Sequence, residues 1–151
     1  MNVSPKGPIG SLRILDDHRV AYLDMTGSGI ETASHLNENG RITILFCAFD
    51  GPPLLLRLLG RGRVIMPGDA EWPELVAQFP PSDSARLIVV ADLDRVATSC
   101  GFGVPLMSFE SDRDQLPRFA ASKGPEGMRE YRALKNARSI DGLPAPFGGD
   151  G

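Results

Sequence analysis

The sequence is poor in the residues that build disulfide frameworks and histidine-rich metal centres. Among 151 residues there are 2 cysteines, Cys47 and Cys100, and 2 histidines, His18 and His35. A single possible cysteine pair cannot form the disulfide framework of a small secreted protein. The histidines lie far apart in the chain, which argues against a His-rich metal site. We interpret both cysteines as buried apolar residues and expect no metal.

Long apolar runs and an excess of positive charge are missing as well. No stretch approaches the roughly 18 consecutive apolar residues of a membrane-spanning helix, and the first residues lack the apolar core of a signal peptide. The 16 basic and 19 acidic residues give a net charge of −3, which argues against a general nucleic-acid binder. These absences predict a cytoplasmic protein with neither a membrane nor a nucleic acid as partner.

Turn-forming residues are abundant instead. The chain has 17 glycines and 13 prolines, which suits many short strands better than a helix bundle. Its length predicts one domain, able to bury roughly 70% of its unfolded surface. We place this domain at residues 1–143, including C-terminal helices, and expect a disordered tail over residues 144–151.

The N-terminal half shows alternating strand and helix signals. Apolar residues on both sides of the turn candidate 16–18 predict a hairpin over Ser11–Met25. A helix is predicted over Ile30–Asn39, with Gly40 as its C-cap. Ser28 and Glu31 have the spacing of a capping box at its start.

Two long strands are predicted next. Arg41–Phe49 is apolar on both faces, so we expect it to be buried on both, or to lie between a barrel interior and a partner. Leu54–Ile65 follows, and the glycines at 60 and 62 suggest a bulge or a barrel corner. Consecutive long strands joined by short turns favour an antiparallel sheet that closes on itself.

The C-terminal half is expected to add helices and further strands. A short helix is predicted with Asp69 as its cap, the stretch 87–90 is β-rich, and a bent strand pair is predicted over Val96–Phe109. Two helices separated at 124–125 complete the chain. The fold class predicted from these elements is all-β, a β-barrel with peripheral helices.

The order of these segments resembles the pyridoxamine 5′-phosphate oxidase-like family, the FMN-binding split barrels. The carrying segments are Asn2–Gly7, Val20–Gly29, the helix to Leu36, Gly40–Phe46 and Leu56–Arg61. The terminal segment Lys135–Leu143 looks like the tail of one uncharacterised subgroup. The resemblance implies a Greek-key split barrel, a homodimer, FMN as cofactor, and a flavin-dependent oxidoreductase acting on an unknown small molecule.

A binding module without catalysis is the rival interpretation. The same fold holding a flavin, a deazaflavin or haem would serve storage or sensing, and the sequence identifies no catalytic residue. A flavin absorbance spectrum or a Soret band in the purified protein distinguishes these cofactors.

The start of the predicted helix is the main candidate site. A helix N-terminus suits an anion, and Thr26, Ser28 and Thr32 add hydroxyl groups. A plain capped helix is the alternative. The resemblance implies an Arg-Lys pair for the flavin phosphate at positions that are Glu31 and Thr32 in this chain.

Basic residues elsewhere are the further candidates. Strand alternation places Arg57, Arg61 and Arg63 on one face, where a guanidinium can bind a phosphate in place of the missing pair. A solvated stripe of ion pairs is the alternative for them.

Three more candidates rest on the resemblance. It places Lys6 on the strand beside the flavin ring, and Arg138 and Ser139 in a tail that helps to form the pocket. For Lys6 the alternative is an exposed side chain near the chain end, and for the other two a surface segment.

Overall fold

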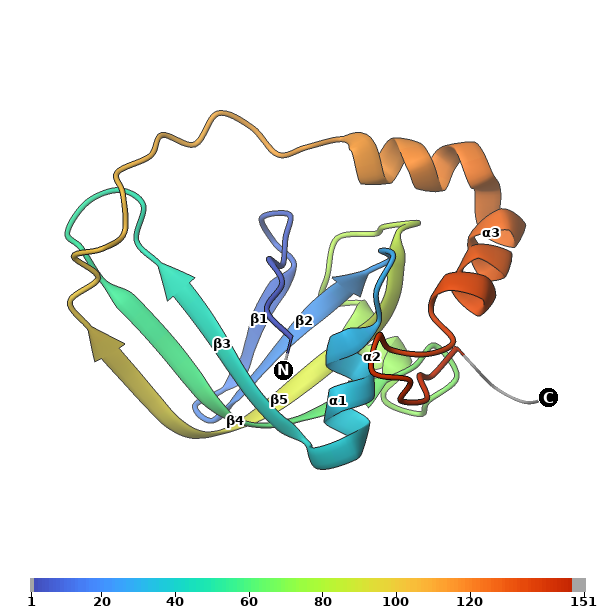
Figure 1. Ribbon diagram of the computed structural model, residues 1–151, viewed down its shortest axis with the longest axis horizontal. Helices are drawn as coiled ribbons and strands as arrows, with labels where there is room; N and C mark the ends of the chain where they lie inside the picture. Colours follow the sequence, from blue (N-terminus) through green and yellow to red (C-terminus); the bar gives the residue numbers. More distant parts are fainter. Residues whose placement is uncertain (1, 148–151) are drawn as a thin grey trace.

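Five strands form one antiparallel sheet in a computed structural model that describes residues 2–147. The sheet order is β1-β2-β5-β4-β3 (Figure 1). The strands are β1 (Leu12–Asp16), β2 (Arg19–Met25), β3 (Arg41–Cys47), β4 (Leu55–Ile65) and β5 (Ala85–Ser99). The helices are α1 (Glu31–Asn39), α2 (Trp72–Val76) and α3 (Gln115–Lys135).

The predicted hairpin is confirmed as β1 and β2. Its turn is held by the Asp16 carboxylate, which accepts hydrogen bonds from the His18 backbone N–H at 2.9 Å and from Arg19 Nε at 2.6 Å. These two hydrogen bonds lower the pKa of Asp16. The turn sets the register in which Ile14 lies opposite Val20.

The predicted helix is confirmed as α1, but its capping box is wrong. Gly40, with φ of 70°, ends the helix and donates its N–H to the Leu36 carbonyl. At the start, Ile30 occupies the N-cap position, and no side chain of the described residues caps the helix. The Glu31 carboxylate instead accepts the Ile140 backbone N–H at 3.0 and 3.1 Å. A long-range contact therefore replaces the local one.

The predicted bulge is confirmed where β4 pairs with β5. The register slips between Leu59, opposite Arg95, and Gly60, opposite Leu93. A Cβ atom on Gly60 would lie 1.9 Å from the Asp92 carbonyl oxygen, so only glycine fits this approach.

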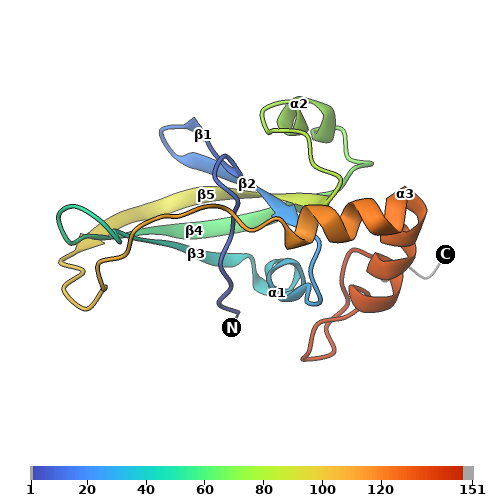
Figure 2. The same ribbon diagram turned by 90° about the horizontal axis from the view of Figure 1, so that it is seen from above.

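The core lies on both faces of the central strands, where β2 and the first half of β5, up to Ala91, are buried. Figure 2 shows α1 and α2 on opposite sides of the sheet. The buried cluster on the α2 side consists of Ala21, Leu23, Ile65, Leu75, Phe79, Ile88 and Val90. The buried cluster on the α1 side consists of Tyr22, Ile30, Ala33, Leu36, Leu87, Val89 and Ala145. The predicted cap of α2 is wrong, because the Asp69 carboxylate accepts the Met66 N–H in the preceding turn and Glu71 is the N-cap.

The predicted burial of the Arg41–Phe49 strand on both faces is wrong for the single chain. β3 is an edge strand that pairs only with β4 within the described residues. Leu45 is 51% exposed and Phe46 is 39% exposed. The described residues leave both side chains partly exposed, and a partner that covers them stays a prediction.

The predicted burial of the two cysteines is wrong for related reasons. Cys47 is half-buried, because it ends the edge strand β3, and Cys100 is exposed, because it follows the last residue of β5. Apolar character alone does not bury a side chain where no second layer covers the sheet.

The expected barrel is not confirmed, because the sheet is open. β1 and β3 lie at opposite edges within residues 2–147. The strand pair predicted over Val96–Phe109 is wrong, since β5 runs on to Ser99 and residues 100–114 contain no strand or helix. This segment instead leads from β5 to α3 as an extended connection (Figure 1).

The C-terminal part turns back onto the sheet. Within α3 the helix breaks at Gly124, whose φ is 66°, which confirms the two predicted helices. Part of the expected tail is described: Ala145 is buried and its N–H donates to the Ala137 carbonyl at 3.1 Å. Residues 148–151 of that tail lie outside the described residues.

Candidate functional site

A cleft of about 260 Å³ opens beside the N-terminal end of α1. Three parts of the chain form it: the N-terminal segment, the end of β2 with the loop and first turn of α1, and β5. Its lining residues are Asn2, Ser4, Pro5, Lys6, Asp24, Met25, Gly27, Ser28, Gly29, Glu31, Thr32, Ala33, Arg86, Leu87 and Val89.

Polar contacts hold the N-terminal segment in the wall of this cleft. Asn2 donates from Nδ2 to the Thr32 hydroxyl oxygen at 2.8 Å. Lys6 Nζ lies 2.7 Å from Asp24 Oδ1 and 5.4 Å from the centre of the Tyr22 ring. Residues 2–7 form no strand, so these side-chain contacts position the segment.

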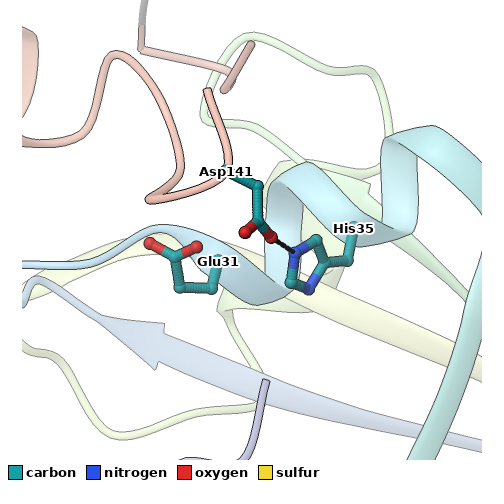
Figure 3. A group of neighbouring side chains, drawn as sticks. All are labelled: Glu31, His35 and Asp141. Carbon is teal, nitrogen blue, oxygen red and sulfur yellow. Dashed lines mark hydrogen bonds and ion pairs between the residues drawn. The ribbon is translucent and has the colours of Figure 1, made fainter. Parts of the chain in front are cut away.

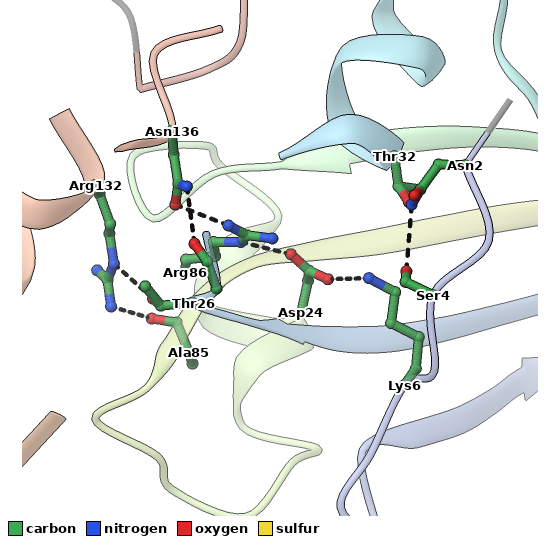
Figure 4. Close-up of polar contacts among 11 residues, drawn as sticks. Asn2, Ser4, Lys6, Asp24, Thr26, Thr32, Ala85, Arg86, Arg132 and Asn136 are labelled. Carbon is green, nitrogen blue, oxygen red and sulfur yellow. Dashed lines mark hydrogen bonds and ion pairs between the residues drawn. The ribbon is translucent and has the colours of Figure 1, made fainter. Parts of the chain in front are cut away.

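A buried ion pair forms the floor of the cleft. Arg86 Nε donates to Asp24 Oδ2 at 2.7 Å, and the two side chains are 5% and 6% exposed. Asp24 thus binds Arg86 on one oxygen and Lys6 on the other, so two cations share one carboxylate (Figure 4). Buried charges persist only when they are paired and hydrogen-bonded, as these are.

The same network reaches the end of α3. Arg86 Nη1 donates to Asn136 Oδ1 at 2.8 Å, and Asn136 Nδ2 donates to the Gly27 carbonyl at 2.9 Å. Asn136 is 0% exposed, and its amide joins β5 to the loop that leads into α1. The C-terminal end of α3 is thereby tied to the rim of the cleft.

Arg132 makes a parallel contact one turn earlier on α3. Its Nε donates to the Thr26 hydroxyl oxygen at 2.9 Å and its Nη2 to the Ala85 carbonyl at 2.9 Å. Burial, together with the nearby Arg86 guanidinium, lowers the pKa of Arg132. Thr26 is buried against α3 and is not among the residues that line the cleft.

Comparison with known proteins now assigns the family. No family model matches the chain. The chain is 41% identical over 160 residues to the pyridoxamine 5′-phosphate oxidase family protein ustO of Aspergillus flavus, and the match covers 95% of this chain. The chain belongs to the pyridoxamine 5′-phosphate oxidase family. It spans 64% of the length of that relative.

Solved structures give a weaker likeness. Two crystal structures of HupZ from Group A Streptococcus, one of a single-residue variant, are 21% identical with a TM-score of 0.47. They cover 62% of this chain, which corresponds to 76% and 73% of the HupZ chains. Within residues 2–147 of this family member, no helix has the length and apolar character needed to cross a membrane.

Three of the candidate residues meet at the cleft of this family member. Lys6, Ser28 and Thr32 line it, although the Thr32 oxygen already accepts a hydrogen bond from Asn2. Glu31, at one of the family's basic positions, lines it too and adds a negative charge.

The arginines of β4 lie elsewhere in the single chain. Arg57 donates to Ser99 Oγ at 2.9 Å, and Arg63 forms a bidentate ion pair with Glu71 at 2.7 and 2.8 Å. Arg61 donates to the Asn39 carbonyl at 3.2 Å, at the far end of α1. Nine residues of helix span roughly 13 Å, so Arg61 is about that far from the first turn of α1.

The two tail candidates lie in a loop beside α1, outside the cleft lining. Ser139 is buried and its Oγ accepts the Leu143 N–H at 3.1 Å, while Arg138 is exposed and donates to the Gly142 carbonyl at 3.2 Å. Because their neighbour Ile140 donates its N–H to Glu31, this loop rests on the first turn of α1.

Sequence reasoning missed the polar network that builds the cleft floor. A usable signal was present, because Asp24 interrupts an apolar strand and Arg86 directly precedes the apolar run 87–90. Charged residues within buried strands have partners. Which partners they have depends on contacts 62 and 50 residues apart, for Asp24 and Asn136 respectively, and no local pattern reports these.

The residues of one chain do not fit the phosphate half of FMN. The cations Lys6 and Arg86 are already shared with Asp24, and the first turn of α1 carries Glu31. The cleft volume of about 260 Å³ is also below the ~300–1,000 Å³ common for cofactor pockets. A complete flavin site therefore needs residues from outside this cleft.

Proposed function

We propose that this chain binds a flavin at the cleft and, as a homodimer, acts as a flavin-dependent oxidoreductase on a small molecule. The observation that carries the proposal is the position of Lys6, Ser28 and Thr32 around one cleft in a member of the pyridoxamine 5′-phosphate oxidase family. FMN is the first candidate and a deazaflavin the second.

In this proposal the cleft receives the ring end of the cofactor. The Lys6 ammonium is 32% exposed and held by Asp24, so it offers positive charge to the electron-rich edge of a ring. Ser28 and Thr32 supply hydroxyl groups, and Leu87 and Val89 supply apolar surface in the lining. A bound flavin supplies the electron-transfer chemistry, and the chain provides orientation and charge.

The phosphate end is proposed to lie at the contact between two copies of the chain. Arg57, Arg61, Arg138 and Ser139 are the candidate ligands there. Exposed arginines bind phosphate through two parallel hydrogen bonds, and the Glu31 carboxylate opposes an anion near α1.

A titration of FMN, followed by quenching of its fluorescence, tests the assignment. Wild type is compared with Arg57→Ala, Arg61→Ala and Glu31→Lys. We expect Glu31→Lys to bind most tightly, wild type next, and at least one arginine variant about thirtyfold more weakly, corresponding to ~2 kcal/mol. Arg95→Ala is the matched control, because Arg95 is exposed on the neighbouring strand and is no candidate ligand.

Three outcomes contradict parts of the proposal. Equal affinity for FMN in wild type and all variants would mean that the phosphate does not bind at these residues. Binding of a deazaflavin but not of FMN would contradict the cofactor assignment, while the cleft would remain the proposed binding site. A Soret band in the purified protein, without flavin absorbance, favours a haem-binding module instead of a flavoenzyme.

A further inference from the structure

A mixed cluster of potential metal ligands lies at the outer end of the C-terminal loop. Glu31 and His35 are one turn apart on the same face of α1, and Asp141 reaches them from the loop (Figure 3). One ligand atom from each side chain lies within 4.8 Å of the others. Neither the flavin proposal nor the family assignment uses this combination of residues.

The charges of the cluster are unbalanced. Within residues 2–147, neither Glu31 nor Asp141 lies within ion-pair distance of a lysine or arginine. The partner of Asp141 is the His35 ring, with Nε2 3.0 Å from Oδ2. Two carboxylates thus meet an imidazole with neither a lysine nor an arginine beside them, which is a donor set that suits a metal ion.

Backbone contacts hold the three side chains in place before any ion binds. Glu31 accepts the Ile140 N–H, so the loop residue next to Asp141 is fixed to the first turn of α1. The loop closes on itself because Ser139 donates its N–H to the Leu143 carbonyl at 2.9 Å. Solvent reaches the cluster on the Asp141 side, because that side chain is 59% exposed, whereas the His35 side chain is 16% exposed.

We propose that Glu31, His35 and Asp141 bind one divalent cation, with Zn²⁺ as the preferred ion. An imidazole nitrogen with carboxylate oxygens suits zinc and other transition metals better than Mg²⁺ or Ca²⁺. At metal–ligand distances of about 2.1 Å a tetrahedral site needs ligand atoms about 3.4 Å apart, which small side-chain rotations reach from the present separations. Three protein ligands leave the fourth position open to water or an anion.

Calorimetric titration with Zn²⁺ alone tests this site. Wild type is expected to bind one Zn²⁺ per chain, and Asp141→Asn and His35→Asn to bind it at least about tenfold more weakly. Asp141→Asn changes an exposed loop side chain, so it keeps the fold, and circular dichroism verifies this. His18→Ala is the matched control, because it removes the other histidine and should leave the affinity unchanged.

Further variants test which side chains bind the zinc ion. Cys47→Ser with Cys100→Ser tests the thiols, and unchanged binding supports the proposed cluster. The melting temperature should rise with Zn²⁺ in wild type and His18→Ala, and stay constant in Asp141→Asn. Absence of saturable binding up to about 1 mM Zn²⁺, or binding lost only in the cysteine variant, overturns the proposal. The titration contains no flavin, so its result does not depend on the proposed function.

Discussion

Asp24 shows how one residue organises the candidate site. It lies near the end of β2, directly after the buried residues 20–23, it is 4% exposed, and it binds both Lys6 and Arg86. Loss of one partner of such a buried pair leaves an uncompensated charge, which commonly costs about 3–5 kcal/mol. The Lys6 side chain reaches the cleft because Asp24 holds it there. A binding role for Lys6 therefore depends on a neighbour that itself need not touch a ligand.

Tyr22 provides a prediction at the same scale. Its hydroxyl is buried without a hydrogen-bond partner among the described residues, and burial, with the nearby Asp24 carboxylate, raises the pKa of its phenol. Tyr22→Phe should change the free energy of unfolding at pH 7 by less than about 1 kcal/mol, because no hydrogen bond is lost. Urea denaturation measures this change.

The raised pKa of Tyr22 also gives a dependence on pH. A group whose pKa is higher in the folded state than the unfolded value of about 10 adds stability below that pH. This stability is lost as the pH rises above about 10, because only the unfolded chain then releases the proton. Wild type should lose more stability than Tyr22→Phe between pH 7 and about 10.5, and parallel losses would contradict this. Tyr131→Phe is the control, since it keeps the ring contact with Phe119.

At the scale of an element, the long β4–β5 pair depends on one glycine. Gly60→Ala would place a methyl group 1.9 Å from the Asp92 carbonyl oxygen, a backbone atom that cannot move without breaking the bulge. We expect a loss of about 3 kcal/mol or more in the free energy of unfolding. The measurement is urea denaturation followed by circular dichroism.

A second glycine gives the matched control for this element. Among the described residues, no neighbouring atom lies within 4 Å of the position that a methyl group on Gly103 would take. Gly103→Ala should therefore change stability by no more than about 0.5 kcal/mol. Equal stability of the two variants would contradict this prediction. It would mean that the strands separate easily at the bulge and that the close approach of Gly60 to Asp92 does not limit the free energy of unfolding.

At the scale of the whole molecule, apolar side chains gather at one end of the open sheet. Leu45 and Phe46 on β3, Leu54 before β4 and Val96 on β5 are 39–58% exposed. Backbone contacts bring neighbouring segments together there, because Ala48 donates to Leu54 and Met107 donates to Phe49. Exposed apolar surface that spans several elements is typical of an interface.

We therefore expect a homodimer that covers this end of the sheet. Light scattering at micromolar concentration should give twice the chain mass of 16.3 kDa for wild type. Leu45→Lys should shift the mass toward the monomer, because it places a charge in the interface. Ile14→Lys is the matched control, since Ile14 is 76% exposed on β1 at the opposite edge. A monomeric wild type would count against both the dimer and a site completed by a second copy.

Local signals in the sequence determined the elements, and long-range contacts decided the site. The hairpin, α1 with its Gly40 cap, the bulge at Gly60 and the break at Gly124 follow from turn residues and apolar periodicity, which act over a few neighbours. Ser28 and Thr32, beside the start of α1, were also within reach of that reasoning, whereas Lys6 became a candidate only through the family resemblance. The open sheet, the exposed face of β3, the Asp24–Arg86–Asn136 network and the meeting of Glu31 with the C-terminal loop were not. Each of these joins segments that are distant in the chain, and a chain brings such segments together only when the sheet order and the packing of α3 are set.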